Sequence, residues 1–547
     1  MIQKPFGQSI TPLLTATLLL CTASASAQNM TLDPLVVTTS AMDTPHEVTT
    51  DPRRPQASLP AQDGAAFLES ITGFNVSRKG GTSGEPVLRG LGGSRLNISA
   101  NGGGLLGAGP GRMDPPTAYI FPHSYDRIEI TKGPQSVRHG PATAGSVRFE
   151  RSAPEFAQQA TRGFTSFTAG SHARNDLATE VITGSRNGYA RFIGTLSKQD
   201  DYEDGGGDSV HSEHERWSTS AIAGWTPDRD TNIEFTYERS DAEAAYDDRA
   251  MDGIVFDRTS YRLSASRDNL TSWLTRVEAS AFYNDMHHEM DNFRLRDPGM
   301  MTMARVVDRN TLGGRMGADM DLVPATDIHA GVDFSTNEHA DSGRIMEMGN
   351  PLAALNFRSV KTPDIAEFSD FGVFADMERE LDRNSWLTLG IRGDYHEAEV
   401  LADSYSDAER GETDTRTQWS GFGRYEVALQ NLPVNLYAGL GRSERAPDFW
   451  ERDRDFSISN ESLTQVDAGL SLNHLRLEGT IAVFHGWYDD YILITEQGAS
   501  ARNIDAITRG IEADLAVDLT TTLTLNSTFA YTRSTNDSDN EPLAQTP

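Results

Sequence analysis

The run YDRIEITKGPQSVRHGPATAGSVRFE, residues 125–150, closes a stretch in which short β-rich segments alternate with glycine-dense loops. The segments 87–91 and 95–99 have this β-rich character, and residues 127–131 repeat it inside the run itself. The loop 102–111 contains too much glycine to be the interior of a helix or a strand. Because such a loop needs a scaffold to rest against, we predict a small domain that sits inside something larger.

The pattern changes beyond residue 151. Apolar and polar residues alternate in segments of about ten, which is typical of transmembrane β-strands. Clear examples are 233–238, 511–519 and 522–531. A soluble β-sandwich has the same period, but so many strands with charged faces favour a barrel with a polar interior. Aromatic residues near segment ends suit interfacial girdles: Trp487, Tyr488 and Tyr491.

Helical membrane spans are excluded by the hydropathy of the chain. Apart from the extreme N-terminus, no apolar run approaches the roughly 18 residues that a spanning helix needs. One short helix is predicted at 65–71, leading into an extended segment at 74–77. The fold class predicted is therefore an all-β transmembrane barrel with a smaller α+β domain at its N-terminal side.

Three motifs carry a resemblance to a known family. The segments RIEITKGP at 127–134 and HGPATAG at 139–145, supported by VLRGLGG at 87–93, resemble the plug domain of TonB-dependent outer-membrane receptors. The resemblance implies a plug domain at 61–150 in the lumen of a transmembrane β-barrel at 151–547, with about 22 antiparallel strands in the family. It also implies a monomer that is surrounded by outer-membrane lipid in a Gram-negative bacterium.

Residues 1–27 have the features of a secretory signal peptide. Lys4 precedes an apolar core from Leu13 to Cys21, and Ala25-Ser26-Ala27 follows it. The mature chain is therefore predicted to be exported. Cys21 is the one cysteine of the chain and lies in the part removed, so we expect neither a disulfide nor a thiolate ligand.

Residues 28–60 are predicted to contain a TonB box and a linker. A short extended, β-branched segment stands alone in this polar tail and suits addition to the sheet edge of a partner: Asp33, Pro34, Leu35, Val36, Val37, Thr38 and Thr39. In the family this position holds the TonB box. The resemblance thus implies the periplasmic protein TonB, with its inner-membrane energising complex, as partner.

The end of the sequence departs from the family pattern. The last alternating segment ends at Arg533, and residues 534–547 are polar. Family members usually end with a strand that finishes in an aromatic residue. An open barrel edge is not tolerated in lipid, because its backbone groups stay unpaired. From the sequence we expect that several C-terminal strands are missing and that the barrel is incomplete.

The net charge and the motifs that the sequence lacks narrow the range of possible functions. The formal net charge of -31 argues against nucleic acid as a partner and favours cationic ligands. The loop 102–111 is neither a Walker motif nor a GxGxxG ahead of a helix, and the chain has no HExxH. We therefore predict no enzyme and no catalytic cofactor. The chemistry expected is the binding and transport of a ligand.

Methionines cluster in one part of the chain: Met286, Met290, Met300, Met301, Met303, Met316, Met320, Met346 and Met348. For most of them we favour packing, since methionine fills irregular gaps. The triplet His288-Glu289-Met290 differs. Residues two apart in a strand point to the same side, so His288 and Met290 can hold one ion while His287 faces away. Thioether sulfur prefers Cu(I), and imidazole binds either copper state.

Two segments extend the resemblance to the copper-receptor branch of the family. GRMDPPTAYIFP at 111–122 and YNDMHHEMDNFRLR at 283–296 resemble the two halves of its copper site. Carried over, Met113 comes from the plug, and His288 with Met290 comes from the barrel wall; the transported ligand is a copper ion or a copper complex. The branch often has a cysteine four residues before that methionine, where this chain has Gly109. This departure leaves the copper oxidation state open, and a glycine with positive φ would resist a cysteine.

Two other functions remain open at this stage. A siderophore or zinc receptor shares the plug but needs a site without Met113 and His288. A surface-binding protein without uptake would keep its function after deletion of residues 33–39.

Overall fold

The computed structural model describes residues 44–54, 60–78, 80–349, 352, 355–494 and 500–543. The predicted signal peptide, 1–27, and the predicted TonB box, 33–39, lie outside the described residues. Within the described ranges, no helix is both long and apolar enough to cross a membrane.

The N-terminal part is an α+β domain built on two small sheets. One has the order β1-β7-β8-β5-β6, with β5 and β8 parallel, and the other has the order β2-β3-β4. The elements are β1 (Glu47–Thr50), α2 (Gly64–Leu68), β2 (Phe74–Arg78), β3 (Gly84–Leu88), β4 (Leu91–Gly92), η1 (Gly93–Arg95), β5 (Leu96–Ala100), β6 (Gly103–Gly104), η2 (Pro110–Arg112), η3 (Pro116–Tyr119), η4 (Pro122–Ser124), β7 (Arg127–Lys132) and β8 (Gly145–Glu150).

The helix predicted at 65–71 is confirmed as α2, although it ends at Leu68. It begins at Asp63, whose carboxylate accepts a hydrogen bond from the Ala66 N–H and so caps the first turn. The segment β1 lies within the range 28–60 predicted to be TonB box and linker, yet it pairs with β7 along its whole length.

The rest of the chain forms one large antiparallel sheet. Its strands are β9 (Ala160–Ala169), β10 (Asn175–Ser185), β11 (Gly188–Gln199), β14 (His214–Trp225), β15 (Thr231–Ala244), β16 (Asp252–Asp268), β17 (Leu274–Asp291), β18 (Met301–Val323), β19 (Thr326–Asp341), β20 (Ile345–Met348), β21 (Asp364–Asp382), β22 (Ser385–Val400), β23 (Thr413–Ala428), β24 (Val434–Arg445), β25 (Glu461–His474), β26 (Leu477–Ile494), β27 (Ala501–Thr520), β28 (Leu523–Asn536) and β29 (Glu541–Pro542). The connections carry β12 (Tyr202–Glu203), β13 (Ser209–Val210), η6 (Phe357–Ser359) and α3 (Phe449–Arg452).

The sheet closes into a barrel in the described residues. Its order follows the chain from β10 to β29 and returns to β9, with 19 strands against the 22 or so expected. This closure rests on the two-residue strand β29, which pairs with β28 only at Thr535 and Asn536, whereas β9 pairs with β10 along its whole length. The missing C-terminal strands expected from the sequence stay a prediction. The last long strand runs to Asn536 rather than Arg533, and β29 pairs with it. This pairing escaped prediction because backbone hydrogen bonds do not require alternating side chains.

Alternation along the strands gives the barrel a polar interior. In β22, Arg392 and Asp394 are buried while Leu389 and Ile391 are exposed on the other face. This is the arrangement of a strand whose outer face meets lipid. The barrel class predicted from the alternating segments is confirmed.

The two ends of the barrel differ in the length of their connections. One end has short turns such as 324–325 and 383–384, and the other has long loops such as 401–412 and 446–460. Bacterial outer-membrane barrels have short periplasmic turns and long extracellular loops. We therefore call the long-loop end the outer end.

The girdle role predicted for Tyr488 and Tyr491 is wrong. Trp487 is exposed on the outer face, but both tyrosines are buried inside the barrel. A register shift in the β26–β27 pairing, with Asp490 at φ 57°, interrupts the alternation between them. As a result Tyr491 also points inward, where the Arg95 guanidinium lies 3.9 Å from its ring centroid.

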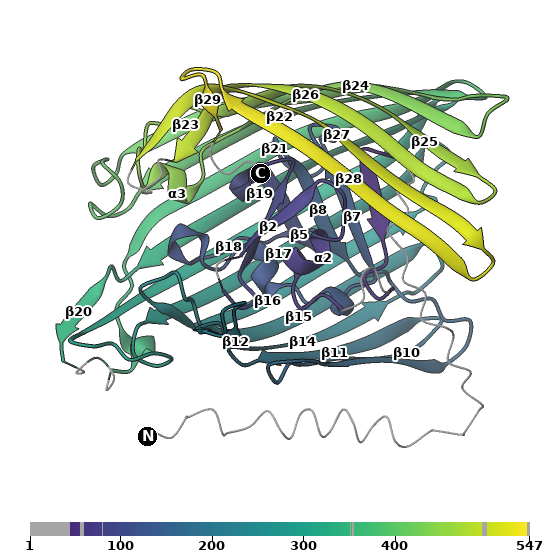
Figure 1. The fold of residues 1–547 in the computed structure, drawn as a ribbon. Helices are drawn as coiled ribbons and strands as arrows, with labels where there is room; N and C mark the ends of the chain where they lie inside the picture. Colours follow the sequence, from purple (N-terminus) through teal and green to yellow (C-terminus); the bar gives the residue numbers. More distant parts are fainter. Residues whose placement is uncertain are drawn as a thin grey trace.

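The N-terminal domain lies inside the barrel, as the purple elements in Figure 1 show. Buried ion pairs fix it there. Glu512 of β27 accepts hydrogen bonds from Arg89, at 2.8 Å, and from Lys132, at 2.9 Å. Arg138, which is itself exposed, pairs with the buried Asp376 of β21. The domain is thus attached to two separate parts of the wall.

Candidate metal site

A loop of the plug, residues 107–114, carries Met113 and Gly109. Its shape comes from Asp114, whose carboxylate accepts hydrogen bonds from the N–H groups of Ala108, at 2.8 Å, and Gly109, at 2.6 Å. The Tyr119 hydroxyl donates a third, at 2.7 Å. Burial and the adjacent Asp114 carboxylate raise the pKa of Tyr119 well above its ordinary value, so this hydroxyl keeps its proton.

His288 lies opposite this loop, near the outer end of β17. Its Nδ1 lies 2.8 Å from the Val255 carbonyl oxygen, so Nδ1 carries the proton and donates it there. The other nitrogen, Nε2, is then a bare lone pair, and it is buried without a hydrogen-bond partner. A metal-binding histidine commonly donates its second N–H to a carbonyl in this way. The geometry suits His288 for ligation through Nε2.

Gly109 is the point where the plug loop and His288 meet. A Cβ built on Gly109 would lie 3.0 Å from His288 Nε2 and 2.6 Å from Asp114 Oδ1. The backbone of Gly109 has φ −71° and ψ 144°, which any residue adopts. Glycine is therefore not required here by a positive φ, and its lack of a side chain leaves the space between the imidazole and the carboxylate free.

Met113 and Met290 are both buried in the apolar cluster that fills this part of the interface. The Tyr246 hydroxyl donates to the Met113 carbonyl oxygen at 3.1 Å and fixes the backbone of that residue. Met290 lies opposite Gly253 in the β16–β17 pairing, and His288 lies opposite Phe256. The structure thus places His288 and Met290 on the inner face of the wall, beside the loop that carries Met113.

His287 points to the other side of β17, as the alternation predicts. It contacts Asp308, at 2.6 Å, and Glu289, at 3.1 Å, in a separate polar group.

The packing role predicted for most of the methionine cluster is wrong for the members of the outer loops. Met300, Met346 and Met348 are exposed, the last two on β20, which pairs with the beginning of β18. Figure 1 shows β20 at the far end of the barrel, away from the plug. Met316 is exposed on the lipid face. The packing interpretation holds at Met286, which is buried in the apolar cluster, and at Met303, which packs against it.

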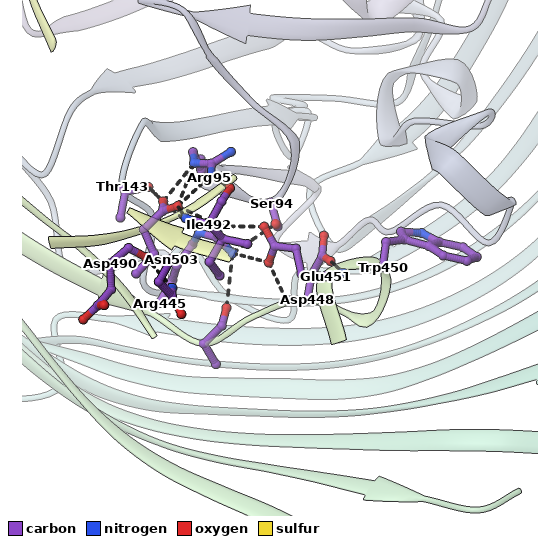
Figure 2. A network of polar contacts seen from close by, with 12 residues as sticks. Ser94, Arg95, Thr143, Arg445, Asp448, Trp450, Glu451, Asp490, Ile492 and Asn503 are labelled. Carbon is purple, nitrogen blue, oxygen red and sulfur yellow. Dashed lines mark hydrogen bonds and ion pairs between the residues drawn. The ribbon is translucent and has the colours of Figure 1, made fainter. Parts of the chain in front are cut away.

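Arg112, at the other end of the loop, makes two ion pairs, and one of its partners, Asp448, belongs to the network of polar contacts in Figure 2. Arg112 donates to Glu85 at 2.8 Å and to Asp448 at 3.3 Å. Burial opposes the charge of Arg112, but these two carboxylates outweigh it and raise its pKa. Asp448 caps α3, in which Glu451 pairs with Arg445 at 2.8 Å. Met113 therefore follows a residue that is anchored to the outer loop 446–460.

A polar cavity of about 770 Å³ adjoins the site. Gly109, Asp114 and Arg309 line its outer part, and Arg276 and Asp319, near the short turns, line its inner part. Arg309 donates to the Gly107 carbonyl oxygen at 2.8 Å. Gly109 and Asp114 thus join the candidate site to a space that extends along the barrel wall.

Sequence reasoning missed Asp114 and Arg309. Asp114 stands inside the GRMDPPTAY segment, so its position next to Met113 was a signal, but only the fold shows that its carboxylate faces His288. A search of the described residues for three or more His, Cys, Asp or Glu side chains that could hold a metal finds none. The candidate set contains His288, Asp114 and two methionines, so only two of its members are of these four residue types.

Comparison with known proteins identifies the family. Residues 194–547 match the family described as TonB dependent receptor-like, beta-barrel, and residues 40–147 match the TonB-dependent Receptor Plug Domain. The chain belongs to the TonB-dependent receptors. The members of this family are outer-membrane receptors of Gram-negative bacteria that depend on TonB. The plug and barrel predicted from the motifs are confirmed.

Solved structures give the same result. A structure titled "Copper transporter OprC" is 38% identical, covers 94% of this chain and 83% of its own, and has a TM-score of 0.89. The FrpB iron transporter from Neisseria meningitidis is 14% identical over 92% and 82% of the two chains, with a TM-score of 0.69. The ferric yersiniabactin uptake receptor FyuA from Yersinia pestis is 13% identical over 92% and 81%, with a TM-score of 0.70. The last two share the fold alone. No match was found among curated proteins.

Proposed function

We propose that this TonB-dependent receptor binds copper between its plug and its barrel wall and imports it into the periplasm. The observation that carries the proposal is the buried, unpartnered Nε2 of His288, which faces the plug loop at Gly109. A bare imidazole lone pair in a buried place is unfavourable unless a ligand occupies it. The sulfur atoms of Met113 and Met290 are the further ligands proposed.

The donor types favour copper over iron. Imidazole nitrogen and thioether sulfur are borderline and soft ligands, which suit Cu(I) and Cu(II), whereas ferric siderophores are recognised through their organic part. The 38% identity to a copper transporter over most of both chains supports the same cargo. TonB, acting on residues 33–39, is the proposed source of energy for release.

Copper affinity of the purified receptor under reducing conditions tests the site. We expect His288→Ala and Met113→Ala each to weaken Cu(I) binding at least about tenfold, because each removes a direct ligand. His287→Ala is the matched control, since that side chain lies on the same strand but faces Asp308. Metal analysis of the parent, comparing copper with zinc and iron, checks the cargo. If both site variants bind Cu(I) as the parent does, the assigned ligands are wrong.

A further inference from the structure

The Asp114 carboxylate has one acceptor position that the loop does not use. Its Oδ2 accepts hydrogen bonds from the Ala108 N–H and the Tyr119 hydroxyl, and its Oδ1 accepts one from the Gly109 N–H. A carboxylate oxygen has two lone pairs, so Oδ1 keeps one. Asp114 is fully buried, which makes an unused lone pair costly.

Oδ1 is also the carboxylate oxygen that faces His288. Both Oδ1 and His288 Nε2 lie within 3.0 Å of the point that a Cβ of Gly109 would occupy. Metal–nitrogen and metal–oxygen bonds in proteins are about 2.0–2.2 Å long. An ion near that point therefore has both atoms within reach after shifts of less than about 1 Å.

We propose that Asp114 is a metal ligand of this site and that its carboxylate oxygen enables the receptor to bind Cu(II) as well as Cu(I). This inference rests on the proposed copper function and names the forms of cargo. Carboxylate oxygen is a hard ligand that suits divalent ions, whereas thioether sulfur selects Cu(I). The site then offers two overlapping donor sets that share His288: Asp114 for Cu(II), and the two methionines for Cu(I).

The lack of a side chain at Gly109 leaves the Asp114 carboxylate accessible to an ion. A side chain at this position would occupy the space between Oδ1 and Nε2, because its Cβ would already lie 2.6 Å from the oxygen. Without that side chain, the one negatively charged group of residues 107–114 faces the imidazole directly. In this chain the carboxylate thus takes the place of an anionic ligand on the plug side.

The alternative is that Asp114 only shapes the loop, which its three hydrogen bonds also do. The two roles differ in what they predict for the two copper states. Asp114→Asn removes the negative charge but keeps an oxygen that can accept from Ala108 and Tyr119. A ligand role predicts a selective loss of Cu(II), whereas a shaping role predicts equal losses, because Met113 would be displaced as well.

The experiment measures Cu(II) affinity in air and Cu(I) affinity with ascorbate, on full-length purified receptor, for the parent, Asp114→Asn and Tyr119→Phe. Tyr119→Phe deletes one of the three hydrogen bonds and leaves Oδ1 unchanged. We expect Asp114→Asn to weaken Cu(II) at least about tenfold and Cu(I) less than about threefold. We expect Tyr119→Phe to leave the ratio of the two affinities as in the parent. The electron paramagnetic resonance spectrum of bound Cu(II) should also change in Asp114→Asn, since a carboxylate donor is lost.

Equal weakening of both copper states by Asp114→Asn, or unchanged Cu(II) binding and an unchanged spectrum, would overturn the inference. If Asp114→Asn does not fold, the spectrum of the parent decides: g and copper hyperfine values typical of nitrogen and sulfur donors alone overturn it. A parent that binds Cu(I) through His288 but never Cu(II) also overturns this inference and leaves the proposed function intact. A parent that binds neither copper state defeats the proposed function itself.

Discussion

At the scale of single residues, Gly109 decides what the site can bind. Its φ of −71° admits any side chain, so the obstacle to a cysteine is crowding by Asp114 Oδ1 and the His288 ring. Crowding by side-chain atoms can be relieved by small movements. The conformational objection that the sequence raised against a cysteine here therefore does not apply.

We predict that Gly109→Cys raises Cu(I) affinity at least about tenfold, because it adds a thiolate beside His288 Nε2. Gly109→Ser is the matched control, with nearly the same size and no sulfur. Both variants are titrated with Cu(I) in competition with a chelator. A cysteine variant that binds no better than the serine variant would show that the thiolate does not reach the ion.

The residues of the site differ in how far sequence could predict them. His288 and Met290 follow from alternation along one strand, a local rule that needs no tertiary structure. Met113 required the resemblance, since nothing in its own neighbourhood brings it to β17. Asp114 was missed because its role depends on a contact across 174 positions of sequence, through the space left by Gly109.

At the scale of elements, β1 joins the plug sheet to the N-terminal segment, and His46 precedes it. His46 is buried, and its Nδ1 has no hydrogen-bond partner. Burial, with the charges of Arg424 and Arg89, holds the pKa of His46 well below its ordinary value. Glu426, 4.0 Å away, is the carboxylate that faces it.

This lowered pKa makes plug stability depend on pH. Unfolded His46 takes a proton near pH 6.5, but folded His46 does so only at lower pH, so stability is complete above about 6.5 and falls below it. The slope is at most about 1.4 kcal/mol per pH unit. We expect His46→Gln to reduce the slope of the plug unfolding free energy between pH 5 and 6.5, with the exposed His474→Gln as control. Equal slopes for parent and His46→Gln would contradict the prediction.

The ion pairs between plug elements and wall strands differ in how deeply they are buried. They therefore differ in how much each one stabilises the plug. Glu512 is buried and accepts from Arg89 and Lys132, which come from different plug segments. Glu512→Gln leaves the buried Lys132 with a neutral partner and Arg89 with Asp467 as its remaining carboxylate, so we expect the plug to lose about 3 kcal/mol of stability. The exposed pair Arg442–Asp489 gives the control, since Asp489→Asn should change little. Urea midpoints for protease cleavage of the plug measure both. Similar midpoints would show that Glu512 does not hold the plug.

The sequence predicts where the long strands lie better than it predicts their register and the short strand at the end of the sheet. Alternation located β15, β27 and β28, because one face meets lipid and the other meets the polar lumen. The alternation rule gave the wrong side for Tyr491, because the spacing of apolar and polar side chains does not reveal a register shift between two strands. It also failed at β29, whose polar residues carry no period at all.

At the scale of the whole molecule, the polar inner face of the barrel wall is matched by the buried charges of the plug that fills it. A barrel of this size has a lumen that side chains of the wall cannot fill, so a plug is needed to close it. The plug leaves one polar cavity of about 770 Å³ that runs from the candidate site toward the short turns. An ion bound at His288 is thus buried from outside yet adjoins a space on the inner side.

Energy for release must then reach the plug from its N-terminal side. The proposed TonB box, residues 33–39, precedes β1, which is the edge strand of the five-stranded plug sheet and is paired with β7. A pull on this segment would act first on the β1–β7 hydrogen bonds, next to Lys132 and its contact with Glu512. In the proposed function, TonB would thus pull on the segment that precedes an element paired with β7, the strand that ends at Lys132.

The last prediction separates binding from transport. Val36→Pro removes a backbone N–H from the TonB box, so a partner strand cannot pair fully with it. We expect copper uptake by cells to fall to the level of a strain without TonB, while the purified variant binds copper as the parent does. Val36→Ala keeps the N–H and should keep uptake. Because the substitution lies far from His288 in the sequence, a loss of uptake with intact binding can only reflect energy coupling. Normal uptake by Val36→Pro would favour a surface-binding protein or another route of entry.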